Sequence, residues 1–159
     1  MDILTAKGQI SVQDEQQAKM IFEQNFPAYQ YIETPKNKPA AFDAVLVKDK
    51  TIRAIVETKC RRDMDVQKFR TAYNSEWLVT YAKLKDCAQV SDMIGVPLIG
   101  FLYIQPSNAL LVHEIYSNGQ FLPRISIERT ETQATTNGGK IVRSNAYIDM
   151  KDAKTFYER

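Results

Sequence analysis

The sequence predicts an α/β domain in which a mixed central sheet is flanked by helices. Helical apolar repeats occur before and after a pair of short β-like runs. The second repeat leads into Leu98–Ile104, an almost wholly apolar run that is typical of a buried strand. Helices and strands interleaved in this way pack as layers around one sheet. A chain of 159 residues suits one domain with one core, which we expect to span residues 1–159.

The composition is that of an ordinary globular protein, with 44% apolar and 25% charged residues. The net charge of +2 gives no general attraction for nucleic acid, so such a surface would need local clusters of basic residues. The two cysteines, Cys60 and Cys87, favour a reducing compartment over a disulfide scaffold. The first residues lack the pattern of a signal segment, and no apolar run approaches the ~20 residues of a membrane-spanning helix. We therefore expect a cytoplasmic protein with no membrane contact.

The first part of the chain is predicted to form a helix, a short strand and a loop. Ser11 can cap a helix that runs to about Asn25 and stops before Pro27. A short strand is expected at 29–33, followed by a basic loop at 35–39. The apolar residues on one face of the helix are Ala18, Ile21 and Phe22.

A β-hairpin is predicted next, with strands at 40–48 and 52–60. A loop or short helix at 61–73 follows, and then a helix over 76–94 that ends at Gly95. The helical repeat in that stretch consists of Leu78, Tyr81, Leu84, Ala88 and Ser91.

The C-terminal part of the chain has the weakest sequence signals for secondary structure. A strand is expected at 109–115, after the buried one. The more polar segment 116–159 is predicted to hold a hairpin with strands near 124–134 and 140–149 and a glycine-containing tip. A short helix is expected to begin near Met150. This segment could complete the sheet, form a dimer contact or clamp DNA.

The predicted hairpin carries charged residues that strands seldom bury without a reason. Asp43 lies in its first strand, and Glu57-Thr58-Lys59 lies near the end of the second. Acids in apolar strands are costly unless a metal or an opposite charge needs them there. Because strand side chains alternate, Glu57 and Lys59 point to one face and Thr58 points to the other. Two carboxylates and one ammonium on one sheet face are the groups needed for metal-assisted hydrolysis of a phosphodiester.

This pattern resembles the PD-(D/E)XK nuclease superfamily, in which an acid at the start of one strand precedes Glu-x-Lys on the neighbouring strand. The resemblance covers residues 40–62, with weaker support from the order of elements over about 11–115. Phe42 stands where the motif name has proline. The resemblance implies a restriction-endonuclease-like fold and a nuclease that uses Mg²⁺ or Mn²⁺ to hydrolyse DNA phosphodiester bonds.

The resemblance also implies a role for each motif residue. Asp43 and Glu57 would be catalytic metal ligands, and the carbonyl of Thr58 would be a backbone ligand; oxygen ligands of this kind favour Mg²⁺ or Mn²⁺ over zinc. Lys59 would orient or deprotonate the attacking water, or stabilise the pentavalent phosphate. Structural interpretations remain open. Asp43 could be a strand-edge aspartate, Glu57 an exposed glutamate paired with Arg53, and Lys59 a surface lysine.

Further candidates surround this motif. Glu15 shares a helix face with Ala18 and Phe22 and could be a further metal ligand, as a first-helix glutamate is in some members of the superfamily. It could equally be a first-turn acid that the helix dipole favours. Basic residues that could line a phosphate-binding rim, or belong to a solvated surface, are Arg61, Arg62, Lys83 and Lys85. Weaker contacts with the DNA backbone are expected from Lys36, Lys38, Lys140 and Arg143.

The hairpin turn decides whether the two acids can meet. Opposed residues of a regular antiparallel pair have a constant sum of residue numbers. A two-residue loop at 49–50 would put Asp43 opposite Val56, on the wrong face, whereas a three-residue loop at 49–51 would put it opposite Glu57. We therefore predict an odd loop length or a β-bulge, because a slip of one residue moves a side chain to the other face.

Other catalytic chemistries lack their residues. His113 is the only histidine, which excludes two-histidine zinc sites and histidine triads within one chain. We expect it to be structural. Gly138-Gly139 lacks the Lys-Ser/Thr of a P-loop, so no nucleotide cofactor is expected. Trp77 and the tyrosines are expected in the core or at interfaces, not as platforms that stack on bases.

The resulting hypothesis is a small metal-dependent deoxyribonuclease, by analogy with the family in phage or bacterial DNA processing, repair or defence. The chain is too short for a separate specificity domain. It would therefore recognise DNA structure (ends, junctions, nicks), act as a homodimer or rely on a partner protein. A rival hypothesis is a non-catalytic nucleic-acid-binding or assembly module on a nuclease scaffold. A third is an unrelated α/β interaction domain, in which the two acids would lie on opposite sheet faces.

Overall fold

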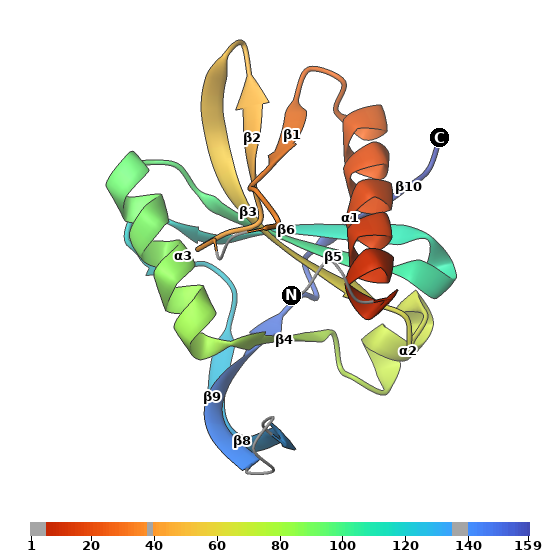
Figure 1. Ribbon diagram of the computed structural model, residues 1–159, viewed down its shortest axis with the longest axis vertical. Coiled ribbons are helices and arrows are strands. Elements are labelled where there is room, and N and C mark those ends of the chain that lie inside the picture. Colours follow the sequence, from red (N-terminus) through yellow and green to blue (C-terminus); the bar gives the residue numbers. More distant parts are fainter. Residues whose placement is uncertain (1–5, 38–39, 135–139) are drawn as a thin grey trace.

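The computed structural model describes residues 6–37, 40–134 and 140–159 of the chain. These residues form two sheets and three α-helices (Figure 1). The α-helices are α1 (Ala6–Asn25), α2 (Val66–Thr71) and α3 (Tyr81–Ile94). The strands are β1 (Gln30–Glu33), β2 (Ala44–Lys48), β3 (Thr51–Arg61), β4 (Glu76–Thr80), β5 (Leu98–Ile104), β6 (Ala109–Ser117), β7 (Gln120–Phe121), β8 (Ile125–Ala134), β9 (Lys140–Asp149) and β10 (Lys154–Tyr157).

The larger sheet is mixed, as predicted. Its strand order is β1-β2-β3-β5-β6-β10, with β7 beside β6. The β3–β5 pair is parallel because β4 and α3 cross over between the two strands, whereas the other neighbours are antiparallel. The smaller sheet is antiparallel, in the order β4-β9-β8. The predicted class, an α/β domain with a mixed sheet flanked by helices, is therefore confirmed for the described residues.

Alternating residues of β3 belong to two separate cores, one on each face of the larger sheet. Val56 packs in the core beneath α1, and Ile55 packs in the core beneath α3 and the smaller sheet. Glu57 and Lys59 have the parity of Ile55 and so belong to the α3 side. The predicted stripe of α1 is confirmed, since its three residues are buried: Ala18, Ile21 and Phe22.

The predicted helix over 76–94 is wrong in its first part, which forms β4. Trp77 and Val79 are buried, whereas Glu76 and Leu78 are exposed, which is the alternation of a strand. The partner of β4 is β9, far along the chain, with Trp77 opposite Ile148. A helical stretch begins only at Tyr81. Because the stabilising partner is distant, the local helical repeat misled the prediction.

Two other elements differ from the predictions, and two agree. The first helix begins at Ala6, so Ser11 lies inside it and does not cap it. The stretch 61–73, predicted as a loop or short helix, contains the short helix α2, whose N-cap Asp65 accepts a hydrogen bond from the Lys68 N–H. The expected terminal helix near Met150 is instead β10, an edge strand that pairs with β6. The predicted hairpin is present as β8 and β9, and its tip lies outside the described residues.

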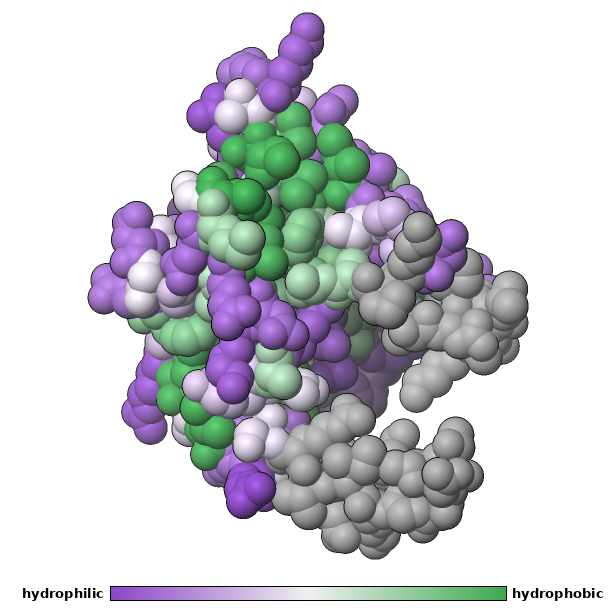
Figure 2. All heavy atoms as spheres, turned by 60° about the vertical axis from the view of Figure 1, so that its left-hand side comes forward, coloured by the Kyte–Doolittle hydropathy of each residue, from purple (hydrophilic) through white to green (hydrophobic). Residues whose placement is uncertain are grey.

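One end of the larger sheet keeps uncovered apolar surface. Ile32 on β1 is 48% exposed and Ile52 on β3 is 46% exposed. Figure 2 shows apolar side chains gathered in the upper part of the molecule, at the height of the β2–β3 hairpin in Figure 1. Within the described part of the chain, no helix is both long enough and apolar enough to span a membrane.

Candidate active site

A β-bulge in the β2–β3 hairpin brings the two motif acids together. The turn has two residues, but the register shifts by one within the hairpin and leaves Arg53 as the extra residue. Beyond the shift, Ala44 pairs with Val56. The same register, continued by one residue, puts Asp43 opposite Glu57. The predicted bulge is confirmed, and the acids lie on one face of the sheet.

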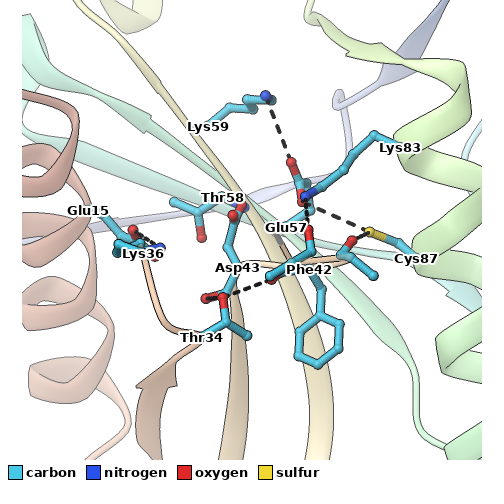
Figure 3. Close-up of polar contacts among 12 residues, drawn as sticks. Glu15, Thr34, Lys36, Phe42, Asp43, Glu57, Thr58, Lys59, Lys83 and Cys87 are labelled. Atoms are coloured by element: carbon cyan, nitrogen blue, oxygen red, sulfur yellow. Dashed lines mark hydrogen bonds and ion pairs between the residues drawn. The ribbon is translucent and has the colours of Figure 1, made fainter. Parts of the chain in front are cut away.

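The backbone around Asp43 is held on both sides. The Thr34 N–H donates to the Asp43 carbonyl at 2.9 Å, and the Asp43 N–H donates to the Val56 carbonyl at 2.9 Å. The Thr34 hydroxyl also lies 2.9 Å from the Phe42 carbonyl (Figure 3). The Asp43 carboxylate accepts a hydrogen bond of 2.8 Å from the Thr58 N–H. The carboxylate is therefore fixed beside β3 by the fold itself.

Glu57 is a buried acid between two lysines. Its side chain is 4% exposed. The Nζ of Lys59 lies 3.8 Å from Oε1, and the Nζ of Lys83 lies 3.6 Å from Oε2. Burial raises the pKa of Glu57 to about 7, and the charge of Asp43 adds to this rise, whereas the two lysines oppose it. The site therefore contains a carboxyl group that gains or loses its proton near neutral pH.

Two structural interpretations of the motif are wrong. Glu57 is not an exposed strand-end residue paired with Arg53, because it is buried and Arg53 lies 3.9 Å from Asp49 instead. The acids also do not lie on opposite sheet faces, as a chance match would allow. The charge of Asp43 acts directly on Glu57, in agreement with their places in the hairpin register.

Helix α3 contributes two residues to the site, Lys83 and Cys87, one turn apart. Lys83 was predicted only as part of a rim, but its Nζ donates to the Ala40 carbonyl at 3.0 Å and contacts Glu57. No sequence pattern singled out Cys87, whose thiol donates to the Ala41 carbonyl at 3.0 Å. Burial raises the pKa of Cys87 to about 12, so it is a neutral thiol. The i,i+4 spacing of these two residues was the signal that could have identified this face of α3.

Glu15 reaches the other side of the site from α1. It lies in the middle of the helix and is buried, so the interpretation as a first-turn acid is wrong. The Nζ of Lys36 lies 2.6 Å from the Glu15 carboxylate (Figure 3). The Tyr31 hydroxyl donates to the same carboxylate at 2.5 Å. Burial raises the pKa of Glu15, Lys36 and Tyr31 lower it, and Asp43 raises it further. The same Tyr31 hydroxyl lies 2.8 Å from the Thr58 hydroxyl, which ties α1 to β3.

The other predicted basic residues lie in different structural environments. Arg62 makes two hydrogen bonds of 2.8 Å to Asp14, so α1 engages its guanidinium. Arg61 is half-buried and continues the face of β3 that carries Glu57. Lys85 lies on the exposed surface of α3, with its Nζ 4.9 Å from the centre of the Tyr81 ring. Three predicted contacts have side chains outside the described part of the chain: Lys38, Lys140 and Arg143.

The residues present fit a hard divalent cation such as Mg²⁺. The Ile55 N–H donates to the Pro97 carbonyl, just before β5, whereas the Thr58 N–H donates to Asp43, so the backbone groups of Thr58 are directed to the β2 side. Since β2 begins only at Ala44, the Thr58 carbonyl falls at an open edge beside Asp43. The described residues contain no cluster of three metal-binding side chains, so a cation here would rest on two carboxylates, this carbonyl and water. A cation would also relieve the burial penalty and the repulsion from Asp43 that together raise the pKa of Glu57.

Comparison with known proteins gives no family for this chain: no family model matches it, and no curated protein matches it. The chemistry of the site therefore has to be inferred from its own residues.

Proposed function

We propose that this protein is a metal-dependent nuclease of the PD-(D/E)XK type, which hydrolyses DNA phosphodiester bonds on a restriction-endonuclease-like fold. The observation that carries the proposal is the meeting of Asp43 and Glu57 on one sheet face, with Lys59 beside them. The order of elements adds support, because the Glu-x-Lys strand is joined through a helical crossover to a buried parallel neighbour.

Each residue has a distinct task in this proposal. Asp43, Glu57 and the Thr58 carbonyl would hold Mg²⁺ or Mn²⁺, whereas Glu15 on α1 would act at a distance through its charge, since Lys36 and Tyr31 already bind its carboxylate. The cation, when bound, would polarise the scissile phosphate and lower the pKa of a bound water. In the reaction, the water oxygen gives up a proton and bonds to phosphorus, one ester P–O bond breaks, and the leaving alkoxide takes up a proton.

Lys59 is the residue that can act on the attacking water or on the phosphate. Its side chain is 40% exposed, so the ammonium reaches the solvent side from which a substrate arrives. Lys83 is held by the Ala40 carbonyl and supplies a second, fixed positive charge. Both ammonium groups are suited to stabilise the negative charge that develops on the phosphate.

The alternative is a non-catalytic nucleic-acid-binding or assembly module, in which the two lysines neutralise Glu57 permanently. The lengths of these ion pairs favour the nuclease. The Lys–Glu57 contacts of 3.6 and 3.8 Å are looser than the 2.8 Å pair between Arg62 and Asp14. The uncovered apolar end of the larger sheet offers a surface through which a second copy or a partner protein could join either kind of molecule.

Cleavage of a panel of linear, circular, single-stranded and branched DNA with Mg²⁺ or Mn²⁺ tests the proposal. We expect metal-dependent cutting by the wild type and a loss of roughly 100-fold or more in Asp43→Asn and Lys59→Ala. Lys154→Ala, an exposed lysine on β10, is the matched control and should cut like the wild type. Equal cutting by all four proteins, or no cutting by the folded wild type, would contradict the proposal.

A further inference from the structure

A cavity of about 560 Å³ opens beside the candidate active site, between α2, β4 and the end of β3. Ligand sites commonly have volumes of about 300–1,000 Å³, so one small aromatic group would fit. Most of its lining is apolar or aromatic, with charged groups at a few points. The lining residues that matter for the argument are Arg61, Tyr73, Trp77, Leu102 and Tyr147.

The cavity is one residue pair away from the acids, on the same sheet face. Across the parallel β3–β5 pair, Glu57 lies opposite Gly100 and Lys59 lies opposite Leu102. The ring of Trp77 rests on Gly100, since a Cβ there would be 2.4 Å from its Cζ3. Leu102 is already part of the cavity lining. Two residues along a strand span roughly 7 Å, so the near wall of the cavity at Leu102 is about one nucleotide from the acid pair.

The lining has the chemistry that a nucleobase needs. Trp77 is 2% exposed and lines the cavity together with the aromatic residues Phe69 and Tyr147. These rings give a base an apolar wall to pack against. Tyr73 is 41% exposed and offers a ring for stacking. Asp63 and Glu76 also line the cavity and can accept hydrogen bonds from exocyclic amino groups.

The positive charges lie where a phosphate backbone would run. Lys59 and Arg61 follow Glu57 at alternate positions of β3, so all three share one face. Lys68 stands over the ring of Tyr73, with its Nζ 5.9 Å from the ring centre. A nucleotide whose phosphate lies near Lys59 would therefore have its base directed toward an aromatic cavity, with cations on both sides.

We infer that this cavity takes an unpaired nucleobase of the DNA strand that is cut, so that the substrate is single-stranded or locally unpaired DNA. This inference rests on the proposed nuclease function. A base paired within a duplex cannot enter a cavity in the protein, whereas an unpaired base can be stacked on aromatic side chains. For Tyr73, this replaces the expectation that the tyrosines serve only in cores or interfaces.

Binding can be followed through Trp77, the single tryptophan of the chain. The metal-free protein would be titrated with single-stranded oligothymidine and with a duplex of equal length, and its fluorescence recorded. We expect single-stranded DNA to change the Trp77 emission and to bind more tightly than the duplex. Tyr73→Ala should weaken this binding by roughly 5- to 150-fold, the usual range for one base–aromatic stack. Tyr157→Ala, at a tyrosine that is 54% exposed on β10, is the matched control and should bind like the wild type.

A second variant covers the case in which Tyr73→Ala fails to fold. Ala72→Leu adds an apolar side chain at the cavity wall, at a helical backbone position that tolerates leucine. It should reduce the affinity for single-stranded DNA without changing the circular dichroism spectrum. Unchanged affinity in a folded Tyr73→Ala or Ala72→Leu variant would overturn the inference, as would equal affinity of the wild type for duplex.

The cleavage assay separates this inference from the proposed function. If Asp43→Asn abolishes cutting while Tyr73→Ala cuts single-stranded DNA as well as the wild type, the nuclease stands and the base cavity is overturned. If Tyr73→Ala weakens binding but the wild type cuts nothing, the cavity stands and the nuclease is overturned.

Discussion

At the residue scale, the site is built around an acid whose ionised form is destabilised by the fold. Glu57 is buried next to Asp43, and its two lysine partners lie at 3.6 Å or more. Its pKa is therefore raised, first by burial and then by Asp43. A group of this kind costs stability when it is ionised, and such costs commonly mark functional sites.

The raised pKa makes the stability of the metal-free protein depend on pH. The pKa of Glu57 rises from 4.5 to about 7 on folding, so the folded state holds this proton more tightly than the unfolded chain. The stabilising effect is complete below about pH 4.5 and is lost as the pH rises through 7. We expect Glu57→Gln to remove this dependence, worth at most about 3 kcal/mol between pH 5 and 8. Urea unfolding at both pH values measures it.

The matched control is Glu114→Gln, at an exposed glutamate of β6, which should keep the pH dependence of the wild type. A Glu57→Gln protein whose unfolding free energy falls with pH as steeply as that of the wild type would show that Glu57 has an ordinary pKa.

At the element scale, the β2–β3 hairpin brings the acids of the site together, and the pairing of β4 with β9 places residues that line the cavity. The need for either an odd loop or a bulge could be predicted from the sequence, because the two acids have to share a face and residue numbers fix the register. Its position at Arg53 could not, since bulges depend on how neighbouring strands twist. Likewise, Lys83 was recognisable as a basic residue on α3, but its contact with Glu57 depends on the packing of α3 against the sheet.

The smaller sheet was the hardest part to predict. The stretch that forms β4 continues without interruption into α3, and a helical repeat runs through both. Only pairing with β9 makes the first residues a strand, and this pairing joins segments about 70 residues apart. The buried face of α1, by contrast, could be predicted, because it depends only on the local helical repeat and on the sheet beneath the helix.

The contact between Trp77 and Gly100 yields a prediction for the packing of these elements. A Cβ at residue 100 would lie 2.4 Å from Cζ3 of Trp77, so one of the two must move. We expect Gly100→Ala to destabilise the protein by about 1–3 kcal/mol in urea unfolding. In a Trp77→Phe background, where the ring is smaller, the same substitution should cost clearly less. An equal cost in both backgrounds would mean that the clash lies elsewhere.

At the scale of the whole molecule, attraction for DNA would come from a few local cations and not from the net charge. The net charge is +2, and the cations that face the proposed path of the substrate are few: Lys59, Arg61, Lys68 and Lys83. Three or four phosphate contacts on single-stranded DNA predict a slope of about −2 to −3 for log K against log[salt]. Titrations between low and moderate salt measure this slope. A slope steeper than about −5 would contradict this small number of phosphate contacts.

The most direct test of the central claim is a calorimetric titration of the protein with Mn²⁺ and Mg²⁺ near pH 7, compared between the wild type, Asp43→Asn and Glu57→Gln. We predict one site in the wild type and its loss in both variants. Binding should also release protons, because Glu57 has a pKa of about 7 and must give up its proton to bind a cation. Metal binding that persists in both variants, or a wild type that binds neither ion, would contradict the account.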